Sequence, residues 1–163
     1  MHPACERNYR RAYPDKLLRV RSRMNAENQQ PVRMRVMIVD DEVKLREAWQ
    51  SLVRAQPDMD VAASLASADR LALAVLEVKP DVVILDLRMP GKDPLEALRE
   101  AVTARPETRA VVFSAMSDQQ IPRLAMEAGA WAYVDKLESP DVILATLRRV
   151  CRMDARPSKR TTQ

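Results

Sequence analysis

The feature that most restricts the fold is an alternation of two patterns that begins at Met34. Five short runs rich in β-branched and other apolar residues end in a polar residue: Asp40, Ser64, Asp86, Ser114 and Asp135. Between them, apolar residues recur three and four positions apart, which is the spacing of amphipathic helices. Successive βα units form a parallel sheet, and their right-handed connections place helices on both faces. The sequence therefore predicts an α/β domain of five strands and five helices.

The expected strands are apolar on both sides, as in VMIV (36–39) and VVIL (82–85). This is typical of a sheet covered by helices on both faces. Five such strands fit the flavodoxin-like, doubly wound order 2-1-3-4-5. Its ligand crevice lies outside the carboxyl ends of the strands, where the order reverses between strands 1 and 3.

Capping residues predict where four of the helices begin. Ser67, Ser117 and Ser139 each precede a helical stretch, and Asp93 precedes Pro94. A side-chain oxygen at the N-cap and a proline at the first helical position are both favoured at helix starts.

The chain of 163 residues has a net charge of +4, but this charge is unevenly distributed. Residues 1–33 and 153–163 are basic, whereas residues 34–152 contain more acidic than basic side chains. We expect a basic, disordered extension over 1–33, one folded domain over 34–152 and a short basic tail over 153–163. Nucleic-acid binding through the core domain is not expected.

Several other classes are excluded by composition. The chain has two glycines, too few for a Gly-rich phosphate loop, and its apolar runs are too short to cross a membrane. Cys5 and Cys151 do not form a disulfide framework or a metal motif. We expect a cytoplasmic protein.

Polar residues gather at the predicted carboxyl edge of the sheet. Asp40 and Asp41 follow strand 1, Asp86 follows strand 3, Ser114 ends strand 4 and Lys136 follows strand 5. Because strands 1 and 3 are predicted neighbours, their carboxylates should converge, and three crowded carboxylates require a cation. Oxygen ligands favour Mg²⁺, and a hydroxyl and an ammonium nearby suit a phosphoryl group.

Four motifs with this order and spacing resemble those of the receiver domain of two-component response regulators, in its stand-alone form. They are MIVDDE (37–42), VVILDLRMPGKDPLEAL (82–98), VVFSA (111–115) and GAWAYVDK (129–136). Two departures stand out: Pro94 occupies a position where the family usually has glycine, and Leu137 replaces the frequent proline after the lysine.

The resemblance implies that Asp86 is the phosphoacceptor. Asp40, Asp41, Asp86 and the backbone carbonyl of Arg88 would bind Mg²⁺ or Mn²⁺. Ser114 would be the switch hydroxyl, whereas Arg88 would also tune the lifetime of the phosphate.

Lys136 would bind the phosphate, Tyr133 would change rotamer on activation, and Met116 would be the second tuning residue. The partners would be a sensor histidine kinase or a histidine phosphotransfer protein, a downstream protein and, as one option, a second copy in a homodimer. The signal would appear on the face formed by the fourth helix, fifth strand and fifth helix. The chain would be a switch rather than an enzyme.

Three alternatives stay open. A haloacid-dehalogenase-like phosphohydrolase also has an aspartate at a strand end, but Asp86-Leu87-Arg88 lacks its second acid. A pseudo-receiver would bind proteins without phosphorylation, yet the acidic pair, the acceptor and the lysine are all present. The chain could also be the receiver part of a truncated DNA-binding transcriptional regulator.

Overall fold

The computed structural model describes residues 33–115 and 120–152. The predicted extension and tail, Met116 and the expected cap Ser117 lie outside these residues, apart from Arg33. The chain divides between Arg33 and Met34 into two units, and the second holds the sheet and its helices.

Five parallel strands form one sheet in the order β2-β1-β3-β4-β5, which confirms the predicted topology. They are β1 (Met34–Val39), β2 (Met59–Leu65), β3 (Val82–Leu85), β4 (Arg109–Ser114) and β5 (Ala132–Asp135). All four residues of β3 are buried, as a central strand with covered faces requires.

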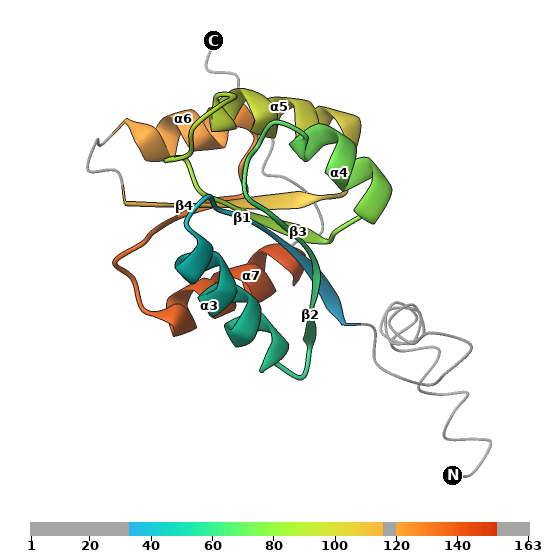
Figure 1. Ribbon diagram of the computed structural model, residues 1–163, viewed down its shortest axis with the longest axis vertical. Coiled ribbons are helices and arrows are strands. Elements are labelled where there is room, and N and C mark those ends of the chain that lie inside the picture. Colours follow the sequence, from blue (N-terminus) through green and yellow to red (C-terminus); the bar gives the residue numbers. More distant parts are fainter. Residues whose placement is uncertain (1–32, 116–119, 153–163) are drawn as a thin grey trace, which may run out of the picture. The chain divides into compact units, whose positions relative to one another are not determined.

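The helices form two layers, one on each face of the sheet (Figure 1). On one face lie α3 (Val43–Arg54) and α7 (Pro140–Arg152). On the other lie α4 (Leu71–Val78), α5 (Pro94–Ala104) and α6 (Ile121–Ala128). Each layer encloses its own apolar core against the sheet.

The core beneath α3 and α7 contains an aromatic pair. The rings of Trp49 and Phe113 meet edge to face, with centroids 4.8 Å apart. Trp49 comes from α3 and Phe113 from β4, one residue before Ser114. The pair therefore joins α3 to the strand that ends at the candidate site.

The predicted cap of α5 is confirmed, whereas that of α4 is wrong. Asp93 accepts a hydrogen bond from the Leu95 amide at 2.8 Å. By contrast, α4 begins only at Leu71, and the Ser67 hydroxyl donates to Asp69 Oδ2 at 3.1 Å. Asp69 Oδ1 also accepts from the Lys92 amide at 3.0 Å, which ties the segment before α4 to a neighbouring loop. This long-range contact delays the start of the helix.

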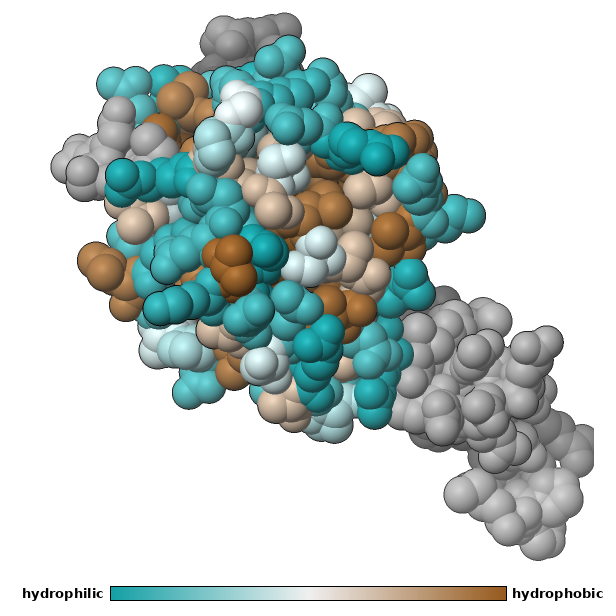
Figure 2. Space-filling view, in the orientation of Figure 1, coloured by the Kyte–Doolittle hydropathy of each residue, from teal (hydrophilic) through white to brown (hydrophobic). Residues whose placement is uncertain are grey.

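The surface is mixed: hydrophobic side chains lie scattered among hydrophilic ones on the face seen in Figure 2. Leu137, in the turn between β5 and α7, is 90% exposed. Within residues 33–115 and 120–152, none of the helices is long and apolar enough to cross a membrane.

Candidate phosphoryl and metal site

Strand pairing brings the acidic residues together. Val39 pairs with Leu85, so Asp40 and Asp86 leave neighbouring strands at the same edge of the sheet. Ligand oxygens of Asp40, Asp41 and Asp86 lie within 4.8 Å of one another. Asp40 and Asp86 are each only 2% exposed. The carboxylates that the sequence predicted to converge are therefore brought into one cluster.

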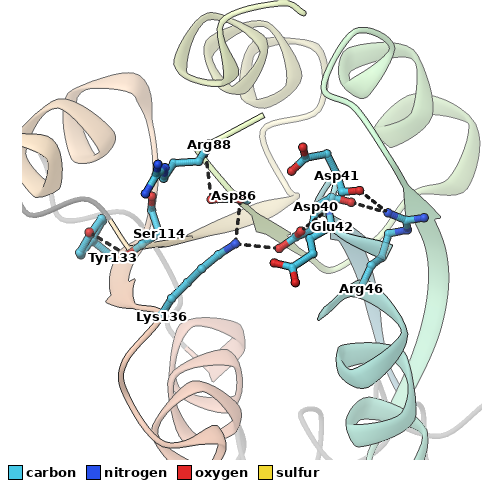
Figure 3. A network of polar contacts seen from close by, with 9 residues as sticks. All are labelled: Asp40, Asp41, Glu42, Arg46, Asp86, Arg88, Ser114, Tyr133 and Lys136. Carbon is cyan, nitrogen blue, oxygen red and sulfur yellow. Dashed lines mark hydrogen bonds and ion pairs between the residues drawn. The ribbon is translucent and has the colours of Figure 1, made fainter. Parts of the chain in front are cut away.

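Asp40 and Asp86 are held in the same way. Each carboxylate uses Oδ1 to accept a hydrogen bond from the amide two residues later, at 2.9 Å from Glu42 and 3.0 Å from Arg88. Each uses Oδ2 to pair with the Lys136 ammonium, at 3.0 Å and 2.7 Å respectively. Figure 3 shows Lys136 reaching between the two carboxylates.

Burial and pairing act in opposite directions on these groups. Burial raises the pKa of Asp40 above its ordinary value, although hydrogen bonds from Lys136 and Glu42 lower it. For Lys136, burial lowers the pKa, but hydrogen bonds to Asp86 and Asp40 outweigh this effect and raise it. Lys136 therefore stays charged and partly neutralises the cluster.

Ser114 presents an unsatisfied hydroxyl. Its side chain is fully buried, and Oγ has no hydrogen-bond partner among the residues that the structure describes. A buried hydroxyl without a partner is costly, so Ser114 Oγ is a candidate donor to a group bound at this edge of the sheet. Ser114 ends β4, beside the carboxyl end of β3 that precedes Asp86.

Tyr133 is linked to Ser114 through the backbone. Its hydroxyl donates to the Ser114 carbonyl oxygen at 3.1 Å, and the Lys136 amide donates to the same oxygen at 3.2 Å. Burial raises the pKa of Tyr133, with a further contribution from Asp135, so its hydroxyl stays protonated at neutral pH. A movement of the Ser114 backbone would therefore change the hydrogen bonds of Tyr133, which lies in β5, and of the Lys136 amide.

The donor set fits a hard divalent cation. Three carboxyl groups and one ammonium give the cluster a negative formal charge. All the candidate side-chain ligands are oxygens, which Mg²⁺ prefers, and Asp41 is half-buried rather than enclosed. Mg²⁺ bound by so few side-chain ligands would keep several water ligands.

Sequence reasoning missed Arg46, although it contacts the acidic turn. Its Nη1 donates to the backbone carbonyl oxygens of Asp40 at 2.7 Å and Asp41 at 3.3 Å. The available signal was its position one turn into α3, since helical side chains lean toward the N-terminus.

A family profile described as the response regulator receiver domain matches residues 36–148. The chain belongs to this family. The match includes every residue of the acidic cluster as well as Ser114, Tyr133 and Lys136. The flavodoxin-like arrangement of this receiver domain is shared by solved structures of the family.

Named relatives agree with this assignment. The chain is 32% identical over 113 residues to the uncharacterized transcriptional regulatory protein YhcZ of Bacillus subtilis, covering 69% of this chain and 53% of YhcZ. It is 36% identical over 108 residues to a protein-glutamate methylesterase/protein-glutamine glutaminase of Rhodopseudomonas palustris, covering 65% of this chain and 28% of that protein.

A solved structure adds a third comparison. The beryllofluoride-activated N-terminal receiver domain of Klebsiella pneumoniae RstA is 28% identical, with a TM-score of 0.66, covering 73% of this chain and 99% of that domain. The chain spans about half or less of the two sequence relatives. The shared part is thus the receiver domain alone.

Proposed function

We propose that this receiver domain is a phosphoacceptor switch in which Asp86 takes the phosphoryl group. The observation that carries the proposal is the meeting of three carboxylates, the Lys136 ammonium and the buried Ser114 hydroxyl at one sheet edge. An ordinary capping role does not account for a hydroxyl with no partner among the described residues.

In the transfer step, a carboxylate oxygen of Asp86 attacks phosphorus. The bond between phosphorus and the donor atom breaks as the O–P bond forms, and its electron pair leaves with the donor. Lys136, already at the Asp86 carboxylate, pairs with the added phosphoryl oxygens. Ser114 Oγ donates a hydrogen bond to them, which satisfies the buried hydroxyl.

Asp40, Asp41, Asp86 and the backbone carbonyl of Arg88 would hold the cation, Mg²⁺ or Mn²⁺. When bound, it offsets negative charge on the transferring phosphoryl group. The amide of Arg88 already binds Asp86 Oδ1 at 3.0 Å, which fixes the turn that presents its carbonyl. Arg88, two residues after Asp86 in sequence, and Met116, two residues after Ser114, would tune the phosphate lifetime.

The output passes through Ser114 to the α6, β5 and α7 face. A displacement of Ser114 toward the phosphoryl group would move its carbonyl and so change the hydrogen bonds from Tyr133 and the Lys136 amide. The new local charge thereby biases a two-state element.

A histidine kinase or phosphotransfer protein is the proposed donor, and a downstream protein is the proposed target. Because the sequence covers 53% of a transcriptional regulatory protein, the second candidate is the receiver part of a longer DNA-binding regulator. A second copy of the chain as a partner and a cytoplasmic location also belong to this proposal.

No catalytic turnover of an external substrate is proposed. Cys151, a free thiol, is not a competing nucleophile, since burial raises its pKa to about 11.

Intact-mass measurement after incubation with acetyl phosphate and Mg²⁺ tests the acceptor. The unaltered chain should gain one phosphoryl group, and Asp86→Asn should gain none. Asp93→Asn is a matched control in the same loop, because asparagine also caps helices well. A full adduct on Asp86→Asn would overturn the assignment, and equal loss in Asp93→Asn would show that the effect is not specific to Asp86.

A further inference from the structure

We infer that Arg46 is a positioning residue that sets the metal affinity of the acidic turn through the backbone. This inference rests on the proposed metal site, but nothing in that proposal requires a residue on α3. In the interactions described above, the Arg46 side chain contacts none of the three carboxylates of the cluster. Its two hydrogen bonds go to the carbonyls of Asp40 and Asp41, the two residues that follow β1 (Figure 3).

The carbonyls that Arg46 binds belong to a turn that α3 does not secure with a side-chain cap. Glu42 is the N-cap residue, and its side chain makes no capping hydrogen bond. The turn is held instead by the Glu42 amide on Asp40 Oδ1 and by Arg46 on the two carbonyls. Polar backbone groups in a part-buried turn need partners, so Arg46 restricts the conformations that this turn can adopt.

This restriction determines where the two carboxylates point. A guanidinium is planar and rigid, and one Nη1 shared by successive carbonyls fixes the orientation of both peptide units. Fixing these peptide units fixes the Cα–Cβ directions of Asp40 and Asp41. The carboxylates of Asp40 and Asp41 are then already close to that of Asp86. Metal binding therefore requires less ordering of the turn.

The charge of Arg46 acts in the opposite direction. A positive guanidinium near the cluster repels an incoming cation, so removing charge alone would tighten metal binding. Removing a positioning contact would weaken it. The sign of the change in Mg²⁺ affinity therefore separates the two roles, and a purely structural role would change stability without a specific effect on affinity.

Calorimetric titration of the full chain with MgCl₂ tests the inference. We expect Arg46→Gln to raise the Mg²⁺ dissociation constant about tenfold, as loss of supporting contacts around metal ligands does. Arg46→Lys keeps the positive charge but not the planar guanidinium. Its Mg²⁺ dissociation constant should lie between those of the unaltered chain and Arg46→Gln. Arg54→Gln is the matched control on the same helix, because Arg54 lies at the far end of α3 from the acidic turn and its Nη2 donates to Gln50 Oε1 at 3.1 Å.

An unchanged or tighter dissociation constant in Arg46→Gln would overturn the inference. Should that variant fail to fold, as judged by circular dichroism without metal, Arg46→Lys decides: affinity equal to the unaltered chain would also overturn it. Asp41→Ala separates this result from the underlying proposal. Absence of Mg²⁺ binding by the unaltered chain, or full binding by Asp41→Ala, contradicts the metal site itself.

Discussion

The Lys136 ammonium lies 2.7 Å from Asp86 Oδ2, although the two residues are 50 positions apart in sequence. It also lies 3.0 Å from Asp40 Oδ2, so one cation bridges two buried carboxylates. In the absence of metal, this ammonium is their counter-ion. Its removal leaves two buried negative charges that must bind another cation or take up protons.

Lys136→Met should therefore destabilise the metal-free domain and make it more responsive to Mg²⁺. Leaving buried charges unpaired costs about 3–5 kcal/mol, and the partial exposure of Lys136 places our expectation near the lower end. Thermal unfolding in EDTA and in MgCl₂ measures both effects. The added metal should recover more stability in the variant than in the unaltered chain.

Lys92→Met provides the control, since Lys92 forms an exposed pair with Glu100. Exposed pairs contribute little to stability, and the loss of this one should not depend on Mg²⁺. Equal losses in the two variants would contradict the counter-ion role of Lys136.

The sheet order, the strand ends and the convergence of the three carboxylates could be predicted because they follow from periodicity and topology. Local sequence patterns predicted helix starts and side-chain contacts less reliably where a residue distant in sequence takes part in the interaction. The start of α4 was mispredicted because Asp69 binds the Lys92 amide 23 positions away. Arg46 was missed because its partners are backbone carbonyls, which leave no signature in side-chain identity.

Ser114→Ala and Thr108→Val should differ in their effect on the free energy of unfolding. Both hydroxyls are buried, but Thr108 Oγ1 donates to the Pro80 carbonyl at 2.8 Å, whereas Ser114 Oγ has no partner among the described residues. Thr108→Val should lower the free energy of unfolding by about 1–3 kcal/mol, and Ser114→Ala should leave it nearly unchanged. Denaturant unfolding without Mg²⁺ measures both.

The same Ser114→Ala variant should respond less to beryllofluoride. A hydrogen bond to a charged group contributes about 1.5–3 kcal/mol, enough to shift a two-state population severalfold or more. Amide chemical shifts of α6 and β5, with and without the mimic, report the response. If Ser114→Ala responds as fully as the unaltered chain, Ser114 does not couple the site to Tyr133.

Asp58 should contribute a pH-dependent part of stability. Arg148 of α7 forms two 2.8 Å hydrogen bonds to its carboxylate, and this pairing lowers the pKa of Asp58 below 3.8. A lowered pKa in the folded state stabilises the fold above the unfolded pKa, and this contribution is lost as the pH falls through the folded value.

Asp58→Ala should therefore lower the free energy of unfolding near pH 7 by up to about 1 kcal/mol, since the pair is exposed. This loss should become progressively smaller below pH 3.8. Urea unfolding across this pH range measures the difference. Glu107→Ala, at an exposed loop position, is the control. A difference that grew on acidification would contradict the assigned direction.

Gly91→Ala should destabilise the loop that follows the phosphoacceptor, for two separable reasons. Gly91 has φ of +95°, and a Cβ there would lie 2.8 Å from Asp69 Oδ1, closer than such contacts allow. The backbone conformation alone costs a residue with a side chain about 1–2 kcal/mol. The close approach adds to this, because Asp69 is held by the Lys92 amide and cannot move freely.

A double-mutant cycle with Asp69→Ala separates these contributions. Asp69→Ala removes the obstructing oxygen and the two hydrogen bonds that the carboxylate accepts from the Lys92 amide and the Ser67 hydroxyl, but leaves the backbone strain at position 91. The double variant should therefore lose less stability in thermal unfolding than the two single variants added together. Strict additivity would show that Asp69 does not restrict position 91. Because this loop begins at Asp86, we also expect Gly91→Ala to slow phosphorylation by acetyl phosphate, and the double variant to recover part of the rate.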